Sequence, residues 1–120
     1  MKVKYQDEKQ YQKLIRDSIP EIMDAKGLGY EIRVLQNEEY LVSLYEKLHE
    51  ELKEIKEATD RKAWIEEMAD LKETMLALLA ANDVSLSELE TVRKEKKKSR
   101  GGFEKRLFLV KTFKKEEGYN

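Results

Sequence analysis

Apolar residues recur every three or four positions through the middle of the chain, a spacing typical of helices with one buried face. The first stripe follows Asn37, which is expected to cap its helix, and consists of Leu41, Leu44, Leu48, Leu52 and Ile55. The second follows an expected cap at Asp60 and consists of Trp64, Met68, Leu71, Met75 and Leu78. Because the break between the stripes is short, they predict an antiparallel helix hairpin that turns near Asp60.

Capping and turn residues mark two further helices. Ser18-Ile19-Pro20-Glu21 is typical of a helix start with proline in the first turn, and Gly27 is a typical stop. Ser85-Leu86-Ser87-Glu88 has the pattern of another helix start. We expect this fourth helix to end at Gly101-Gly102.

Two segments outside these helices mix β-forming and charged residues as strands do. They run from Tyr30 to Leu35 and from Phe103 to Thr112, and we expect them to pair as short strands. The predicted fold class is therefore mainly α, a helical bundle built on the antiparallel hairpin with a small two-stranded β element. Since the apolar faces of the long helices are broad, we expect the bundle to be completed by oligomerisation, as a homo-oligomer.

Length and composition limit the domain organisation and the class of protein. The 120 residues suffice for one core, so 1–120 is predicted to be a single domain whose ends, 1–10 and 114–120, are loose. Cysteine is absent, and neither an apolar leader nor a run of the roughly 20 residues that a membrane span needs is seen. We therefore expect a cytoplasmic protein. A net charge of −1 disfavours nucleic-acid binding by the chain as a whole.

The charges are balanced in total but unevenly placed along the chain. From Glu38 to Glu73, twelve acids stand against six bases, whereas from Val92 to Arg106 eight bases stand against two acids. An acidic segment can hold a divalent metal and a basic one can hold phosphates. The alternative is that both segments are solvated helix faces.

Four acids fall where the hairpin would bring them together. Glu51 and Glu54 lie on one flank of the first apolar stripe, and Glu67 and Asp70 lie on the same flank of the second. Glu54 and Glu67 are equally far from a turn near Asp60, and so are Glu51 and Asp70. Because like flanks meet in an antiparallel hairpin, the arithmetic predicts a cluster of four carboxylates.

Four unpaired carboxylates in contact repel one another, so a cation is needed to hold them together. Mg²⁺ prefers such oxygen ligands, and the cluster is therefore a predicted metal site. Ion pairs along each helix are the alternative, but among the four acids only Glu51 has a base three or four residues away, Lys47. Glu50 and Glu66 point away from the stripes and are expected to lie outside the site.

Three short motifs resemble those of a known family, the MazG-like all-α nucleoside triphosphate pyrophosphohydrolases. Glu50-Glu51-Leu52-Lys53-Glu54 followed by Glu67-Met68-Ala69-Asp70 is similar to the family's EExxE and ExxD metal motifs. The stretch from Lys13 to Ile22 resembles the KLVRDKIPEI opening of a subgroup of predicted house-cleaning nucleotide pyrophosphatases, and Arg100-Gly101-Gly102-Phe103 resembles its closing RGGF. Ser18 stands where that opening usually has lysine.

The resemblance implies an enzyme that hydrolyses a nucleoside triphosphate between its α and β phosphates, giving a monophosphate and pyrophosphate. It implies Mg²⁺ as the cofactor, with Mn²⁺ as a substitute, held by Glu51, Glu54, Glu67 and Asp70. One of these carboxylates would orient or deprotonate the attacking water. The cationic side of the site would bind the phosphates of the substrate and would consist of Lys13, Arg16, Lys96 and Arg100.

Three alternatives stay open at the level of the sequence. The chain could be a helical protein-interaction module whose stripes bind a partner, or a nucleic-acid binder that uses the bases between Arg93 and Arg106. Within the enzyme class, the alternative is phosphoribosyl-ATP pyrophosphohydrolase of histidine biosynthesis, a relative with similar metal chemistry. Neither the base specificity nor the number of metal ions follows from the sequence.

Overall fold

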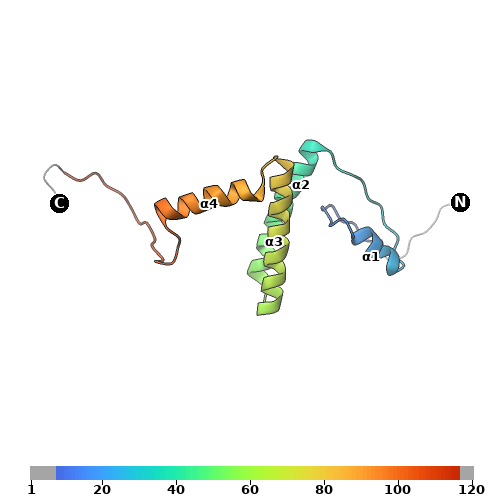
Figure 1. Cartoon of the computed structure of the whole chain (residues 1–120). Coiled ribbons are helices and arrows are strands. Elements are labelled where there is room, and N and C mark those ends of the chain that lie inside the picture. The colour runs from blue at the N-terminus through green and yellow to red at the C-terminus, as the bar shows by residue number, and fades with distance from the viewer. Residues whose placement is uncertain (1–7, 117–120) are drawn as a thin grey trace. The chain divides into compact units, whose positions relative to one another are not determined.

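The computed structural model describes residues 8–116, and all the regular structure in this range is helical (Figure 1). The four helices are α1 (Ile19–Ala25), α2 (Asn37–Glu57), α3 (Arg61–Ala81) and α4 (Leu86–Arg100). The chain divides into two compact units, residues 1–85 with α1 to α3 and residues 86–120 with α4. The single-domain expectation stays a prediction. Of the expected loose ends, residues 1–7 and 117–120 lie outside the described range, and 8–10 and 114–116 form no helix.

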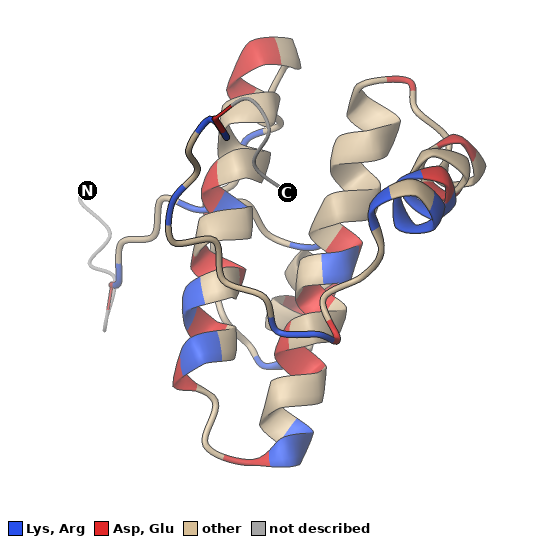
Figure 2. Cartoon of the chain, turned by 90° about the vertical axis from the view of Figure 1, so that its left-hand side faces the viewer, with Lys and Arg blue, Asp and Glu red and all other residues tan. Residues whose placement is uncertain are grey.

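The predicted hairpin is confirmed. Helices α2 and α3 pack side by side in opposite directions, and a short turn through Ala58 joins them (Figures 1 and 2). Asp60 caps α3 as expected, because its Oδ1 atom accepts a hydrogen bond from the backbone N–H of Ala63 at 2.8 Å. An extended backbone at Ala58 and Asp60 ends one helix and starts the next within three residues. The turn therefore lies at the position that fixes the predicted register.

Helices α1 and α4 begin and end close to the predicted capping residues, but two of the expected side-chain caps, at Ser18 and Asn37, do not form. Helix α1 has proline in its first turn and is followed by Gly27 at a φ of +72°. The Ser18 side chain makes no capping hydrogen bond, because its backbone is already helical rather than extended. Likewise Asn37 is the first residue of α2 rather than its cap. Helix α4 is followed by Gly101 at a φ of +82°.

The predicted two-stranded element is wrong for the described part of the chain. Neither 30–35 nor 103–112 forms a strand. A strand exists through backbone hydrogen bonds to a neighbour, and these two segments belong to different units of the chain. The β-forming side chains favour an extended backbone in both segments, but they do not provide either segment with a neighbouring strand.

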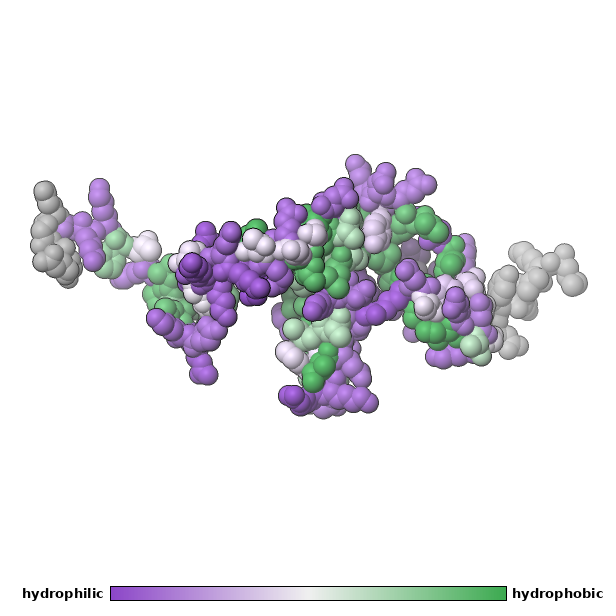
Figure 3. Space-filling model, viewed as in Figure 1, coloured by the Kyte–Doolittle hydropathy of each residue, from purple (hydrophilic) through white to green (hydrophobic). Residues whose placement is uncertain are grey.

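The hairpin buries little within one chain. Among the described residues, Leu44 is the one buried hydrophobic side chain. Several residues of the predicted apolar stripes are instead exposed, and Figure 3 shows hydrophobic surface over the hairpin. The large exposed side chains of α2 and α3 are Val42, Tyr45, Leu52, Trp64, Ile65, Met68 and Met75. In addition, no described helix combines the length and apolarity needed to cross a membrane.

Candidate metal centre

Three carboxylates from the two hairpin helices converge as the register predicted. Glu51 and Glu54 extend from α2 and Glu67 from α3, and one oxygen atom of each lies within 4.8 Å of the others. Red acidic segments on both helices mark this region in Figure 2. The spacing of three residues between Glu51 and Glu54 on α2 and the position of the turn at Asp60 bring these three groups together. This spacing is small enough for three oxygens to contact one ion.

Two oxygen atoms of the cluster have no hydrogen-bond partner. The Glu51 side chain is only 4% exposed, and its Oε2 atom is buried without a donor. The Oε2 atom of Glu67 is also buried and unpartnered. Burying a carboxylate oxygen without a hydrogen bond or a cation is costly, because its hydration is lost and nothing replaces it. The chemistry of these unpartnered oxygens therefore favours a cation between the carboxylates.

The crowding of the carboxylates raises the affinity of Glu51 and Glu67 for protons. Burial, together with the negative charge of Glu54, raises the pKa of Glu51, and Lys47 partly opposes this effect. Hydrogen bonding to Glu54, followed by loss of hydration, raises the pKa of Glu67 to about 7. Two carboxylates can share a hydrogen bond only when one of them holds a proton. Without a metal the cluster therefore favours a proton on Glu67, and a bound cation would oppose this.

One lysine lies beside the cluster, as the ion-pair alternative predicted. The Nζ atom of Lys47 is 3.5 Å from Oε1 of Glu51 and 3.6 Å from Oε2 of Glu50. This pair leaves the Oε2 atom of Glu51 unpartnered. A single ammonium shared between two carboxylates does not neutralise the three converging acids.

The fourth predicted acid, Asp70, lies near the cluster but has a different partner. Its Oδ1 atom accepts a hydrogen bond from Nη2 of Arg16 at 2.7 Å. The charge of Asp70 also contributes to the raised pKa of Glu51, so the two groups interact. Sequence reasoning placed Arg16 on substrate phosphates and missed this ion pair. The two residues are 54 positions apart, and no local pattern links them.

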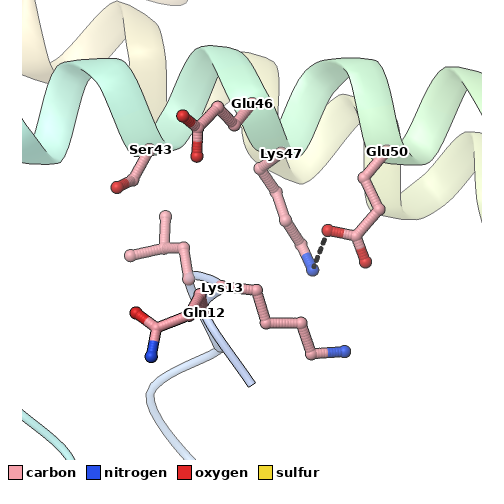
Figure 4. Close-up of a pocket in the computed structure, with 7 residues that line it drawn as sticks. Gln12, Lys13, Ser43, Glu46, Lys47 and Glu50 are labelled. Atoms are coloured by element: carbon pink, nitrogen blue, oxygen red, sulfur yellow. Dashed lines mark ion pairs between the residues drawn. The ribbon is translucent and has the colours of Figure 1, made fainter. Parts of the chain in front are cut away.

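The other predicted cation of the N-terminal segment, Lys13, lines a small pocket beside α2. With Gln12 it lies across from Ser43, Glu46 and the Lys47–Glu50 pair (Figure 4). The pocket between them has a volume of about 50 Å³. This is room for ordered water but far less than the ~300 Å³ or more of a typical small-molecule site. The Lys13 ammonium also lies 5.5 Å from the centre of the Tyr11 ring.

Of the remaining predicted residues, Glu50 and Glu66 lie outside the group formed by Glu51, Glu54 and Glu67. Glu66 is exposed, which agrees with its predicted outward direction, and Glu50 pairs with Lys47. Lys96 and Arg100 are exposed on α4, which belongs to the second unit of the chain. Their role as phosphate ligands stays a prediction.

Comparison with known proteins identifies a family that spans most of the chain. The model of the phosphoribosyl-ATP pyrophosphohydrolase family matches residues 8–100. A protein of Mycolicibacterium smegmatis, named only as uncharacterized, is 43% identical over 53 residues, which are 44% of this chain and 54% of that protein. The match thus spans about half the length of this relative. No solved structure matches the chain. The chain belongs to the phosphoribosyl-ATP pyrophosphohydrolase family, hydrolases of phosphoric anhydrides within the MazG-like all-α superfamily.

Proposed function

We propose that this chain is a Mg²⁺-dependent nucleoside triphosphate pyrophosphohydrolase that cleaves between the α and β phosphates. The products would be a nucleoside monophosphate and pyrophosphate. The observation that carries the proposal is the pair of buried, unpartnered oxygen atoms of Glu51 and Glu67 within a cluster of three carboxylates. Membership of a pyrophosphohydrolase family supports the reaction class.

The residues of the cluster fit a hard divalent cation. Glu51, Glu54 and Glu67 offer only carboxylate oxygens, which suit Mg²⁺ or Mn²⁺ better than zinc or copper. Asp70 is the proposed fourth ligand. When bound, the cation would neutralise phosphate oxygens and make a coordinated water more acidic.

The chain's own carboxylates supply the proton acceptor. The oxygen of an attacking water bonds to one phosphorus of the α–β bridge, and the bridging oxygen leaves with the other. A carboxylate of the cluster not fully occupied by metal takes the proton that the water loses. Guanidinium and ammonium groups offset the charge of the departing pyrophosphate, and we assign this role to Lys13, Arg16, Lys96 and Arg100.

Two substrates of the same chemistry are candidates. The motifs from Lys13 to Ile22 and from Arg100 to Phe103 support a house-cleaning enzyme that removes non-canonical nucleotides in the cytoplasm. The name of the matching family favours phosphoribosyl-ATP, the substrate of histidine biosynthesis, as the alternative. Both reactions break an α–β anhydride, so the same acidic cluster serves either one.

We further propose that the enzyme is a homo-oligomer. The exposed apolar side chains of α2 and α3 exceed what a stable soluble helix pair leaves in water, and Leu44 is the one buried hydrophobic residue in the described range. The pocket at Lys13 is too small for a nucleotide, and a wider hollow of about 510 Å³, lined by Arg61, Lys62, Ile65 and Glu66, does not include the cluster. A second copy would cover the apolar faces and complete a substrate pocket. Light scattering on the full chain tests this.

Product analysis tests the activity. The full chain is incubated with Mg²⁺ and a panel of canonical and damaged nucleoside triphosphates and phosphoribosyl-ATP, and pyrophosphate and monophosphate are quantified. We expect both products in equal amounts from at least one substrate, and none from Glu67→Gln. Release of inorganic phosphate with a diphosphate, or equal turnover in a chelator, would contradict the proposal. A protein-interaction module would instead show no turnover and no rise in melting temperature with Mg²⁺.

A further inference from the structure

Arg16 forms an ion pair with Asp70, the fourth acid of the predicted metal motifs. Its Nη2 atom lies 2.7 Å from Oδ1 of Asp70, whereas the other three acids have oxygens within 4.8 Å of one another. Asp70 is not part of that three-oxygen group. The chain thus supplies its own cation to the fourth carboxylate, from a segment that precedes α1.

The exposure of this pair makes it easy to exchange. The side chains of Arg16 and Asp70 are 56% and 40% exposed. Exposed ion pairs contribute little to stability because water screens both charges and two flexible side chains must be held. A divalent cation carries twice the charge of a guanidinium and can take a carboxylate oxygen as a direct ligand, at a shorter distance than a hydrogen bond allows. Asp70 would therefore leave Arg16 when such an ion binds.

We propose that Arg16 is an exchangeable counter-ion that holds Asp70 in the metal-free chain and moves to the phosphates of the substrate once a divalent cation takes Asp70. This inference rests on the proposed function, because it needs both the metal and the nucleotide. The planar guanidinium matches two phosphate oxygens as well as it matches a carboxylate, so its hydrogen bonds are replaced rather than lost. Arg16 is thus a residue with two successive partners.

The proposed exchange and a purely structural role of Arg16 predict opposite changes in metal affinity. If Arg16 competes with the metal for Asp70, its removal tightens metal binding and at the same time weakens nucleotide binding. If Arg16 only oriented Asp70 as a ligand, its removal would weaken metal binding. The sign of the change in metal affinity therefore distinguishes the two roles.

Mn²⁺ titration of the full chain by calorimetry, without nucleotide, measures that sign. We expect Arg16→Gln to tighten the Mn²⁺ Kd by about twofold to fivefold, the size typical of an exposed ion pair. Arg33→Gln is the matched control, since Arg33 is an exposed arginine outside the helices, between α1 and α2, and is paired with Glu39 instead. It should leave the Kd unchanged. In an Asp70→Asn background, Arg16→Gln should have no further effect, because the competition acts through Asp70.

Steady-state kinetics at saturating Mn²⁺ supply the second half of the test. With the best nucleoside triphosphate of the panel, Arg16→Gln should raise KM by about tenfold, the loss expected for a charged hydrogen bond to phosphate. Arg33→Gln should not change KM. Circular dichroism checks that each variant keeps its helices. Should Arg16→Gln fail to fold, Arg16→Met carries the test, because it also removes the charge, with an Mn²⁺ Kd still tighter than that of the wild type.

Two negative results are possible, and they distinguish the proposed exchange from the proposed metal site. An unchanged or weaker Mn²⁺ Kd in Arg16→Gln, with wild-type binding that depends on Glu67, overturns the exchange and leaves the proposed function intact. Wild-type protein that binds no Mn²⁺, or a Glu67→Gln variant that binds it equally well, overturns the proposed metal site and this inference with it.

Discussion

The acidic segment of the hairpin and the basic segment of α4 carry charge in opposite ways. In the hairpin, Glu51 is buried and Glu67 has a buried oxygen, and both lack a partner for one atom. In α4, the residues from Arg93 to Arg100 are all exposed. Arg93 makes an ion pair with Glu90 at 2.9 Å along its own helix.

The difference shows that the density of charge along a sequence does not by itself mark a site. Both segments stand out equally in the sequence, but only in the hairpin do charged side chains, those of Glu51 and Glu67, bury an oxygen atom without a hydrogen-bond partner. Loss of hydration changes the pKa of a group and makes a cation favourable, whereas exposed charges interact weakly. Variants that compare inward and outward charges therefore test this distinction most directly.

The largest effect is expected at the inward acid of α3. Glu67→Gln should lower metal-dependent kcat/KM by at least about 100-fold, because it removes a proposed ligand oxygen from the cluster. Glu66→Gln is the matched control, being the adjacent exposed acid on the same helix. It should stay within about twofold of the wild type, as expected of a substitution at a surface position away from the chemistry. Steady-state kinetics with Mg²⁺ measure both, and equal losses in the two variants would show that the assigned face is wrong.

Thermal unfolding distinguishes a role of Glu67 in binding metal from a role in stabilising the fold. At 100 times its Kd, Mg²⁺ should stabilise the wild type by about 2.7 kcal/mol and should leave Glu67→Gln nearly unchanged. Without metal, Glu67→Gln should melt at a higher temperature than the wild type, because it removes repulsion between carboxylates. Melting curves in a chelator and in Mg²⁺ provide both comparisons. A metal-free variant less stable than the wild type would argue that Glu67 has a structural role instead.

The pH dependence follows from the raised pKa of Glu67. This carboxyl has a pKa of about 7 in the folded metal-free chain and 4.5 as its ordinary value, so folding favours its protonated form. The stability that this carboxyl contributes is therefore fully present below about pH 4.5 and is lost as the pH rises through about 7, because the folded chain binds the extra proton in that range. The wild type should lose melting temperature relative to Glu67→Gln between these pH values in a chelator. A constant difference would contradict the prediction.

An acid of the hairpin outside the cluster should have a smaller effect. Asp60→Ala removes the oxygen that accepts the Ala63 N–H, so we expect a loss of about 1 kcal/mol in the free energy of unfolding. Asp60→Asn retains a capping oxygen and is the control, with little change. Chemical denaturation measures the loss, and Mg²⁺ affinity should be unchanged once the variant is folded.

The smallest effect is expected in the basic segment. Arg93→Gln breaks the exposed pair with Glu90, which should cost less than ~0.5 kcal/mol of stability. Chemical denaturation at low and high salt checks this, since screening should shrink an already small difference. A loss above about 1 kcal/mol would show that exposed and buried charges differ less than the comparison implies.

Local patterns in the sequence were enough to predict the four helices, the hairpin and its register. Repeating apolar residues set the length of α2 and α3, and Asp60 fixed the turn through a cap made within three residues. Because the rise per residue of a helix is constant, the turn then determined which acids are level with one another. The approach of Glu54 to Glu67 followed from these local facts alone.

Tertiary structure decided the contacts that no local sequence pattern indicates. The sequence could not predict that Arg16 binds Asp70, since a contact across 54 residues depends on how the N-terminal segment folds back. It favoured strands at 30–35 and 103–112, but a strand needs a partner that propensity does not supply. The sequence by itself thus determined the helices and the alignment of the acids, through short-range periodicity. Only packing determined which carboxylates lose their water, because burial depends on every element that surrounds a side chain.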